Sequence, residues 1–172
     1  MEWFRFSHLR RDQPAPAFRL PSAQGTVVAP SDYQGRRNLV LLLLPDLECP
    51  ACRAALRNFS AHREEYEEQA AQVLVILTGP DAEAALGETK DWPFPVLADP
   101  GGAVRQAYTA LLPVPVGEEP LVFVLDRYRG PQVALAGRDL DDPSLHREIL
   151  KWLTFFEIQC PECGAPEWPV EA

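Results

Sequence analysis

The stretch "NLVLLLLPDLECPACRAALRNF", residues 38–59, joins a continuously apolar run to two cysteines that are two residues apart. The run before Pro45 shows no alternation of polar and apolar residues, which is typical of a strand buried on both faces. Pro50 stands directly after the first cysteine, and proline is favoured at the first position of a helix. The stretch therefore predicts a buried strand, a turn with Cys49, and a helix that carries Cys52.

Further strand and helix patterns follow on both sides of this stretch. Short apolar runs predict strands, and amphipathic runs predict helices after the cysteine helix. The predicted strands are 18–20, 26–29, 71–77, 95–98, 121–126 and 132–136, and the predicted helices are 81–87, 102–111 and 141–158. A parallel strand–helix–strand unit followed by a hairpin predicts an α/β fold with a mixed central sheet flanked by helices.

Composition limits the classes of function. The 172 residues fit one domain, and a hydrophobic content of 47% is enough for a core. The net charge of −9 argues against nucleic acid and against anionic membrane surfaces as partners. We see no secretory signal pattern and no apolar run long enough to span a bilayer, so we expect a cytoplasmic protein. In that compartment a CxxC pair is more often catalytic or metal-binding than a structural staple.

The spacing of the first cysteine pair has a chemical reason. The first sulfur would lie beside unpaired backbone N–H groups and the positive end of the helix, which favours the nucleophilic thiolate. A dithiol that attacks a disulfide through Cys49 and resolves the mixed disulfide through Cys52 follows from this arrangement. A zinc knuckle and a pair of core cysteines are the other interpretations, and the position at a strand-to-helix junction favours redox chemistry.

Four segments carry a resemblance to a known family: "PAPAFRLPSAQG", "SDYQGRRNLVLLLLP", "FPVLADPGGAVRQAY" and "EEPLVFVLDRYRG". From Pro14 to about Phe156 the chain resembles the thioredoxin superfamily, in its redoxin or AhpC/TSA (peroxiredoxin-like) branch. The resemblance implies a thioredoxin-like domain over 1–157 with an N-terminal extension, followed by a C-terminal tail, 158–172, that carries a second CPxC motif.

The resemblance supports two mechanisms for the same pair of cysteines. The peroxiredoxin motif is a proline, three residues, a threonine, two residues and the peroxidatic cysteine. Pro45 to Cys52 has this spacing, with Cys49 in the threonine position, which would make Cys52 peroxidatic and Cys49 resolving. The thioredoxin interpretation makes Cys49 the attacking and Cys52 the resolving cysteine, with Arg53 helping to hold the thiolate. Asp46 and Glu48 could accept a proton in that case, or could disfavour the thiolate by their charge.

One departure from the peroxiredoxin pattern concerns the late strand. Peroxiredoxins carry an arginine just ahead of it, whereas this chain has Glu119 and Pro120 there and no arginine until Arg127. Pro120 instead resembles the cis-proline that shapes the substrate site of thioredoxin-like reductases. The alternative is a trans proline that begins a strand.

The second pair, Cys160 and Cys163 in "CPECG", has the form of a zinc knuckle. It could equally be a second redox pair that shuttles electrons to the first by exchange. We favour no metal site, although zinc at Cys160 and Cys163 stays open, and we expect no other cofactor. His62 is predicted to be a helix residue that faces solvent.

Together these patterns predict a thiol–disulfide oxidoreductase with Cys49, Cys52, Pro120 and Arg53 as its catalytic residues. Its expected partners are a protein or small-molecule disulfide as substrate and a thioredoxin-like or other thiol as electron donor. A homodimer is compatible with the sequence. The alternatives are a peroxiredoxin-like thiol peroxidase with antioxidant activity, and a zinc-stabilised or redox-switched interaction module without turnover.

Overall fold

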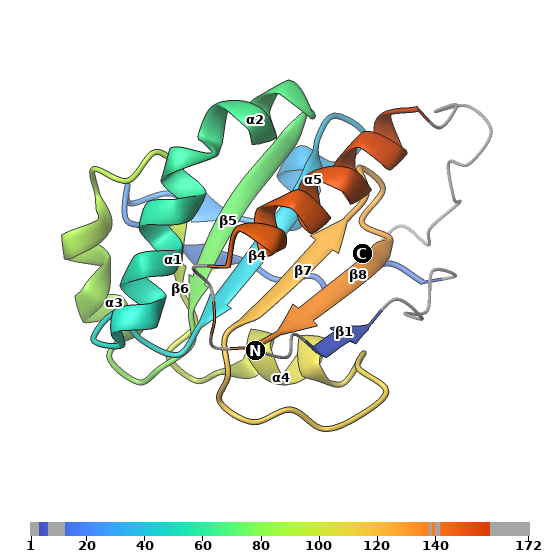
Figure 1. Ribbon diagram of the computed structural model, residues 1–172. Helices are drawn as coiled ribbons and strands as arrows, with labels where there is room; N and C mark the ends of the chain where they lie inside the picture. The colour runs from blue at the N-terminus through green and yellow to red at the C-terminus, as the bar shows by residue number, and fades with distance from the viewer. Residues whose placement is uncertain (1–3, 7–12, 138, 140–141, 159–172) are drawn as a thin grey trace.

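The computed structural model describes residues 4–6, 13–137, 139 and 142–158 as a mixed sheet with helices packed on it (Figure 1). The six strands have the order β1-β8-β7-β4-β5-β6. Their bounds are β1 (Phe4–Phe6), β4 (Asn38–Leu44), β5 (Ala71–Leu77), β6 (Val96–Ala98), β7 (Leu121–Leu125) and β8 (Pro131–Ala136). A separate two-stranded sheet pairs β2 (Leu20–Pro21) with β3 (Val27–Val28). The predicted α/β fold with a mixed central sheet is confirmed.

The helices follow the strands in the predicted order. They are α1 (Pro50–Ala61), α2 (Arg63–Glu68), α3 (Ala82–Ala85), α4 (Ala103–Thr109) and α5 (Pro143–Glu157), with 3₁₀ turns η1 (Pro30–Tyr33) and η2 (Leu86–Thr89). Within the described ranges, no helix is long and apolar enough to cross a membrane.

Strand β4 is the centre of the sheet because its sequence can be buried on both faces. It pairs in parallel with β5 and antiparallel with β7, and all seven of its residues are buried. Alternate residues point to opposite faces. Val40, Leu42 and Leu44 lie in one core cluster, and Leu39, Leu41 and Leu43 lie in the other.

The two faces of the sheet are covered by different parts of the chain. Figure 1 shows α1, α2 and α5 across the face turned to the viewer. Their buried residues, among them Phe59, Tyr66 and Ile149, share the first core cluster. The second cluster joins Tyr108 of α4 to Phe18 of the N-terminal segment. Helix α1, which begins at the cysteine pair, therefore packs on one face of the sheet, and its first turn lies at the edge of the sheet.

Two local features differ from what the sequence predicted. Strand β1 was not predicted, because three residues are too short for a periodic signal, and the partner strand β8 supplies its register. His62 was predicted to face solvent, but it is half-buried, and its ring stacks on that of His146 with centroids 4.0 Å apart. The helix is interrupted at His62, between α1 and α2, which turns this ring toward α5.

His146 of α5 occupies a buried aromatic cluster between α1, α2 and α5. Its Nδ1 lies 2.7 Å from the Tyr66 hydroxyl, and its ring packs edge-on against Phe59 with centroids 4.7 Å apart. Burial, as the larger cause, and the neighbouring His62, as the smaller one, together lower the pKa of His146 to about 4. The imidazole is therefore neutral in the folded protein near neutral pH.

We expect this cluster to make stability fall with acid. The pKa of His146 is lower in the folded than in the unfolded protein, so the unfolded chain binds more protons between about pH 6.5 and pH 4. The stabilisation is complete above this window and is lost as the pH falls through it, by up to about 3 kcal/mol. Urea unfolding at pH 7 and pH 4.5 measures the drop, and His146→Phe should reduce it. An equal drop in both proteins would contradict the assignment.

Candidate active site

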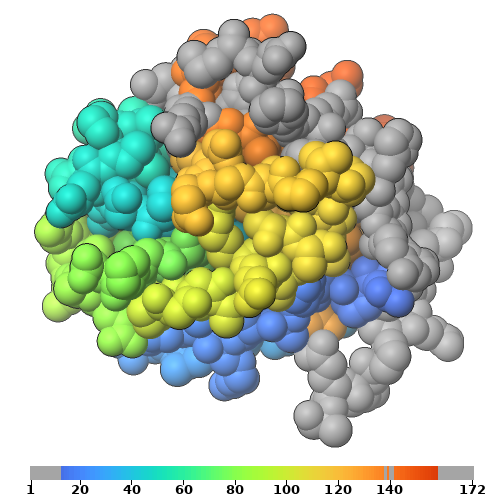
Figure 2. All heavy atoms as spheres, turned by 90° about the horizontal axis from the view of Figure 1, so that it is seen from below, coloured from blue at the N-terminus to red at the C-terminus, as the bar shows by residue number. Residues whose placement is uncertain are grey.

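The carboxyl ends of three strands and the amino end of a fourth meet at one edge of the sheet. Leu44 pairs with Leu77 and Leu77 with Ala98, while Leu43 pairs with Leu121 at the start of the antiparallel strand β7. The turn with Cys49 follows Leu44 directly. Figure 2 looks onto the molecule from below, where the teal, green and yellow-to-amber segments that contain α1, η2 and the approach to β7 lie side by side.

Hydrogen bonds of the Cys49 N–H and carbonyl groups fix the turn that carries this residue. The Cys49 N–H donates to Asp46 Oδ1 over 2.7 Å, which closes the turn between β4 and α1. Cys49 is the N-cap residue of α1, and its carbonyl accepts hydrogen bonds from the N–H groups of Cys52 (3.0 Å) and Arg53 (3.2 Å). Pro50 at the first helical position has no N–H to satisfy. The Cys49 sulfur is thus held at the beginning of the helix by main-chain geometry.

The segment that follows β5 contacts the backbone at the beginning of this turn. Thr78 donates to the carbonyl of Leu44 through its N–H (2.9 Å) and its hydroxyl (3.2 Å). At Gly79 a Cβ atom would lie 2.4 Å from the carbonyl oxygen of Pro45, so only glycine allows this close approach. The Pro45 end of the turn therefore rests directly on the backbone of the neighbouring segment.

The two cysteines have opposite environments. Cys49 is partly exposed, whereas Cys52 has 0% exposed surface and lies on the buried face of α1 with Leu56 and Phe59. Both are free thiols. Burial, which is the largest cause, acts together with the hydrogen bond to the Cys49 side chain and the charges of Cys49 and Asp46 to raise the pKa of the Cys52 thiol to about 12. Cys49 is therefore the accessible sulfur, and Cys52 is a protonated thiol directly beside it.

Arg53 lies in the first turn of α1, next to the cysteine pair. Its Nε donates to the carbonyl of Leu47, and its Nη2 lies 3.7 Å from a carboxylate oxygen of Glu88. These contacts hold the turn before Cys49, and the predicted contact of Arg53 with a thiolate stays a prediction. A pocket of about 270 Å³ opens here, lined by Leu47, Arg53, Leu56, Arg57, Glu88, Thr89 and Trp92.

Pro120 lies at the same edge, because it immediately precedes β7. No peptide bond in the described part of the chain is cis, so the expectation of a cis-proline is wrong and the bond before Pro120 is trans. The trans form is the lower-energy state of a proline bond, and Pro120 lies directly ahead of the first residue of β7. Its carbonyl accepts a hydrogen bond from the Gly137 N–H (3.2 Å).

Arg105 holds the loop before Pro120. Its side chain is buried, and its Nη2 donates to the carbonyls of Gly117 (2.6 Å) and Glu119 (2.8 Å). The N–H of Arg105 donates in turn to Asp99, at the end of β6 (3.3 Å). This residue was missed in the sequence, because arginine is rarely buried and no local pattern marked Arg105 as an exception.

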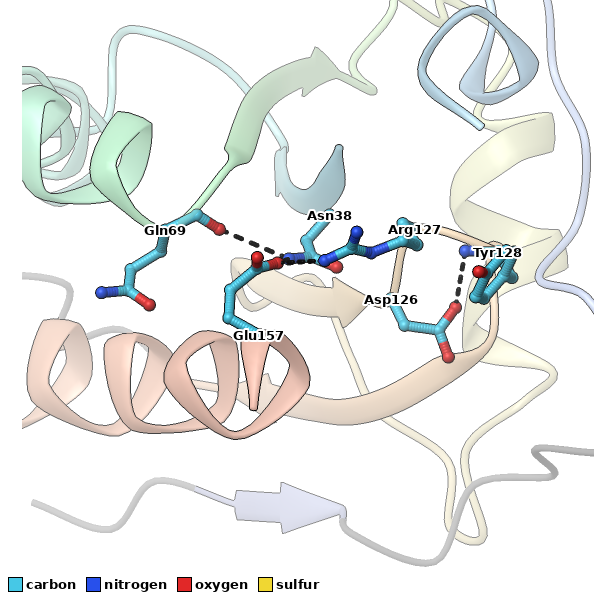
Figure 3. A network of polar contacts seen from close by, with 6 residues as sticks. All are labelled: Asn38, Gln69, Asp126, Arg127, Tyr128 and Glu157. Carbon is cyan, nitrogen blue, oxygen red and sulfur yellow. Dashed lines mark hydrogen bonds and ion pairs between the residues drawn. The ribbon is translucent and has the colours of Figure 1, made fainter. Parts of the chain in front are cut away.

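Arg127 belongs to the opposite edge of the sheet. Figure 3 shows it beside Glu157 and Asn38, where the Arg127 guanidinium contacts Glu157 and the Asn38 amide donates to the same carboxylate oxygen over 2.8 Å. Asn38 is the first residue of β4, and the cysteine turn follows its last residue. A seven-residue strand spans roughly 23 Å, so Arg127 cannot serve as the arginine of a peroxide site at Cys49 and Cys52.

The second cysteine pair, Cys160 and Cys163, lies outside the described residues. Its predicted roles as a shuttle and as a zinc knuckle both stay predictions, as does the domain boundary at 157/158. Within the described part of the chain, no group of three or more histidine, cysteine, aspartate or glutamate side chains could hold a metal ion.

The chain is similar to known proteins in sequence. Residues 12–129 match the model of the AhpC/TSA family. Alkyl hydroperoxide reductase E from Mycobacterium tuberculosis is 32% identical over 97 residues, which cover 55% of this chain and 63% of that protein. The match thus spans less than two thirds of the length of this curated relative.

Solved structures extend the similarity to the fold. The peroxidoxin BcpB of Mycobacterium tuberculosis matches with a TM-score of 0.68 and 22% identity, over 89% of this chain and 100% of that chain. A chain designated a thiol:disulfide interchange protein DsbE, from Chlorobium tepidum, matches with a TM-score of 0.67 and 26% identity, over 84% of this chain and 99% of that chain. Proteins named for peroxide and for disulfide chemistry share this fold, so the fold alone does not separate the two reactions.

Proposed function

The chain belongs to the AhpC/TSA family, and from this premise we propose that it is a thiol–disulfide oxidoreductase that uses the Cys49–Cys52 dithiol. The observation that carries the proposal is the contrast between the two sulfurs. Cys49 is partly exposed at the start of α1, and Cys52 is fully buried with its pKa raised to about 12. A nucleophile must be accessible and ionised, and a resolving thiol needs only to reach its neighbour.

The reaction proceeds in two exchanges. The Cys49 thiolate attacks one sulfur of a disulfide RSSR, so that a Cys49–SR bond forms and RS⁻ leaves. Cys52 then loses its proton and attacks the Cys49 sulfur, which forms the Cys49–Cys52 disulfide and releases the second RS⁻. The dithiol supplies two electrons, and the two RS⁻ groups take up the two protons that Cys49 and Cys52 have released, so that both end as RSH. An external thiol must reduce the new disulfide, and the Cys160–Cys163 pair is one candidate donor.

The surroundings support this assignment of roles. Asp46 fixes the Cys49 N–H, and its carboxylate together with burial keeps Cys52 protonated until the mixed disulfide has formed. Pro120 and the loop held by Arg105 lie at the same edge, where a substrate chain can approach Cys49. The cytoplasmic location predicted from the sequence is part of this proposal, because a reducing compartment keeps Cys49 and Cys52 in the dithiol form that the reaction needs.

A thiol peroxidase is the second candidate, with Cys52 peroxidatic and Cys49 resolving. Two observations favour it: the spacing from Pro45 to Cys52, and the similarity to alkyl hydroperoxide reductase E. The full burial and raised pKa of Cys52 weigh against it, since a peroxidatic cysteine reacts as an accessible thiolate.

Parallel rate measurements test the proposal. We expect the reduced protein to react with the neutral bis(2-hydroxyethyl) disulfide at least about 10-fold faster than a free monothiol does, since Cys49 is positioned and Cys52 resolves. We expect its reaction with hydrogen peroxide to be no faster than that of free cysteine. Stopped-flow mixing with quantification of the remaining thiols gives both rates. A peroxide reaction orders of magnitude faster than that of free cysteine would favour the peroxidase instead.

A further inference from the structure

The pocket beside the cysteine turn has an unbalanced charge. Arg53 and Arg57 lie four residues apart on α1, so that both side chains face the same side of the helix. Glu88 is the negatively charged residue of the pocket lining, and its Oε2 lies 3.7 Å from Nη2 of Arg53. No hydrogen bond or ion pair holds Arg57 within the described residues. Among the described residues, one positive charge is thus left without a partner, in a chain whose net charge is −9.

Apart from Thr89, whose hydroxyl donates to the carbonyl of Leu86 over 2.9 Å, the remaining walls of the pocket are apolar. Leu56 is 1% exposed and lies on the helix face next to the two arginines, and the half-buried Trp92 packs against the core from the other side. Leu47 belongs to the turn that leads to Cys49. With a volume of about 270 Å³ the pocket is near the lower end of small-molecule sites. It suits a short apolar chain that ends in an anionic group.

We propose that this pocket binds small disulfides that carry a carboxylate, and that Arg57 selects them for attack by Cys49. The inference rests on the proposed thiol–disulfide exchange and names the substrate class of the same site. Arg57 pairs with the carboxylate, the methylene groups contact Leu56 and Trp92, and the sulfur end of the ligand extends past Leu47 toward the cysteine turn. Asp46 is a second negatively charged residue near the cysteine turn, but its carboxylate accepts a hydrogen bond from the N–H of Cys49.

Three disulfides of similar length provide the test: 3,3′-dithiodipropionate (anionic), bis(2-hydroxyethyl) disulfide (neutral) and cystamine (cationic). The formation of the Cys49–Cys52 bond in the full-length reduced protein is followed by quenching and mass spectrometry. Each rate constant is divided by that of the same disulfide with dithiothreitol, which removes intrinsic reactivity. We expect the corrected anionic rate to exceed the neutral rate by roughly 2- to 5-fold, as for one exposed ion pair, and we expect high salt to abolish the preference.

The variants separate the pocket from the overall charge. Arg57→Gln should remove the preference, and Arg57→Lys should keep most of it. Arg19→Gln is the matched control, because Arg19 is exposed beside Phe18, which packs on the opposite face of the sheet. An anionic preference that survives in Arg57→Gln, or that Arg19→Gln loses equally, would overturn the inference and leave the exchange function standing. If the wild type reduces none of the three, the proposed function itself fails, and the inference with it.

Discussion

Replacing Cys49 by serine is expected to lower the rate of disulfide reduction on the order of 10³-fold or more, because the hydroxyl group is not ionised at neutral pH and cannot replace the thiolate. Cys52 does not compensate, since it is fully buried and its pKa is raised to about 12. The rate of loss of a small disulfide under pseudo-first-order conditions measures the effect. The fold should be retained, because the side chain of an N-cap cysteine adjoins solvent and serine is a favoured N-cap residue.

The matched variant is Cys52→Ser, which separates attack from resolution. This protein should still attack the first equivalent of disulfide through Cys49, but it should stop at the mixed disulfide. Turnover should fall in both variants, whereas the first covalent step should survive only in Cys52→Ser. If Cys49→Ser keeps a first step as fast as that of the wild type, Cys49 is not the attacking residue.

Removal of the Arg105 guanidinium is expected to destabilise the protein by about 4 kcal/mol, since two charge-assisted hydrogen bonds are lost and two carbonyls are left with one partner fewer. The same change should slow disulfide reduction, because the loop that leads to Pro120 lies at the edge that carries Cys49. The variant is Arg105→Met, whose side chain fills similar space without donors. Urea unfolding gives the free energy of unfolding, and the disulfide assay gives the rate.

Arg147→Met serves as the control for this change. Arg147 is exposed on α5, and no hydrogen bond or ion pair holds it within the described residues. Its loss should alter the free energy of unfolding by no more than about 0.5 kcal/mol. A cost for Arg105→Met as small as that of the control would show that the loop before Pro120 does not depend on the guanidinium.

The regular elements were predictable because local patterns determine them. The apolar run at 38–45 predicted β4 within one residue, and 71–77 predicted β5 with its observed bounds. Both strands are buried on two faces, which leaves a continuous signature in the sequence. The interruption of the cysteine helix at His62 was not predictable, because the ring contact with His146 joins residues far apart in the chain.

The positions of the cysteines in the candidate site were predictable from the sequence, whereas the contacts that hold the neighbouring loops were not. The position of Cys52 on the buried face follows from its spacing to Leu56 and Phe59, four and seven residues on. The contacts of Arg105 with the loop before Pro120 and of Gly79 with Pro45 depend on the packing of separate segments. The resemblance to reductases suggested a cis-proline, whereas the bond before Pro120, the residue directly ahead of β7, is trans.

The most direct test of the central claim is to identify the sulfur that forms the first covalent bond. Full-length Cys52→Ser and Cys49→Ser proteins are reduced, mixed with one equivalent of bis(2-hydroxyethyl) disulfide, quenched with acid and mapped by mass spectrometry. The proposed mechanism predicts a mixed disulfide on Cys49 in the first variant and no rapid adduct on Cys52 in the second. A rapid adduct on Cys52 in Cys49→Ser, or a sulfenic acid there after one equivalent of peroxide, would contradict it.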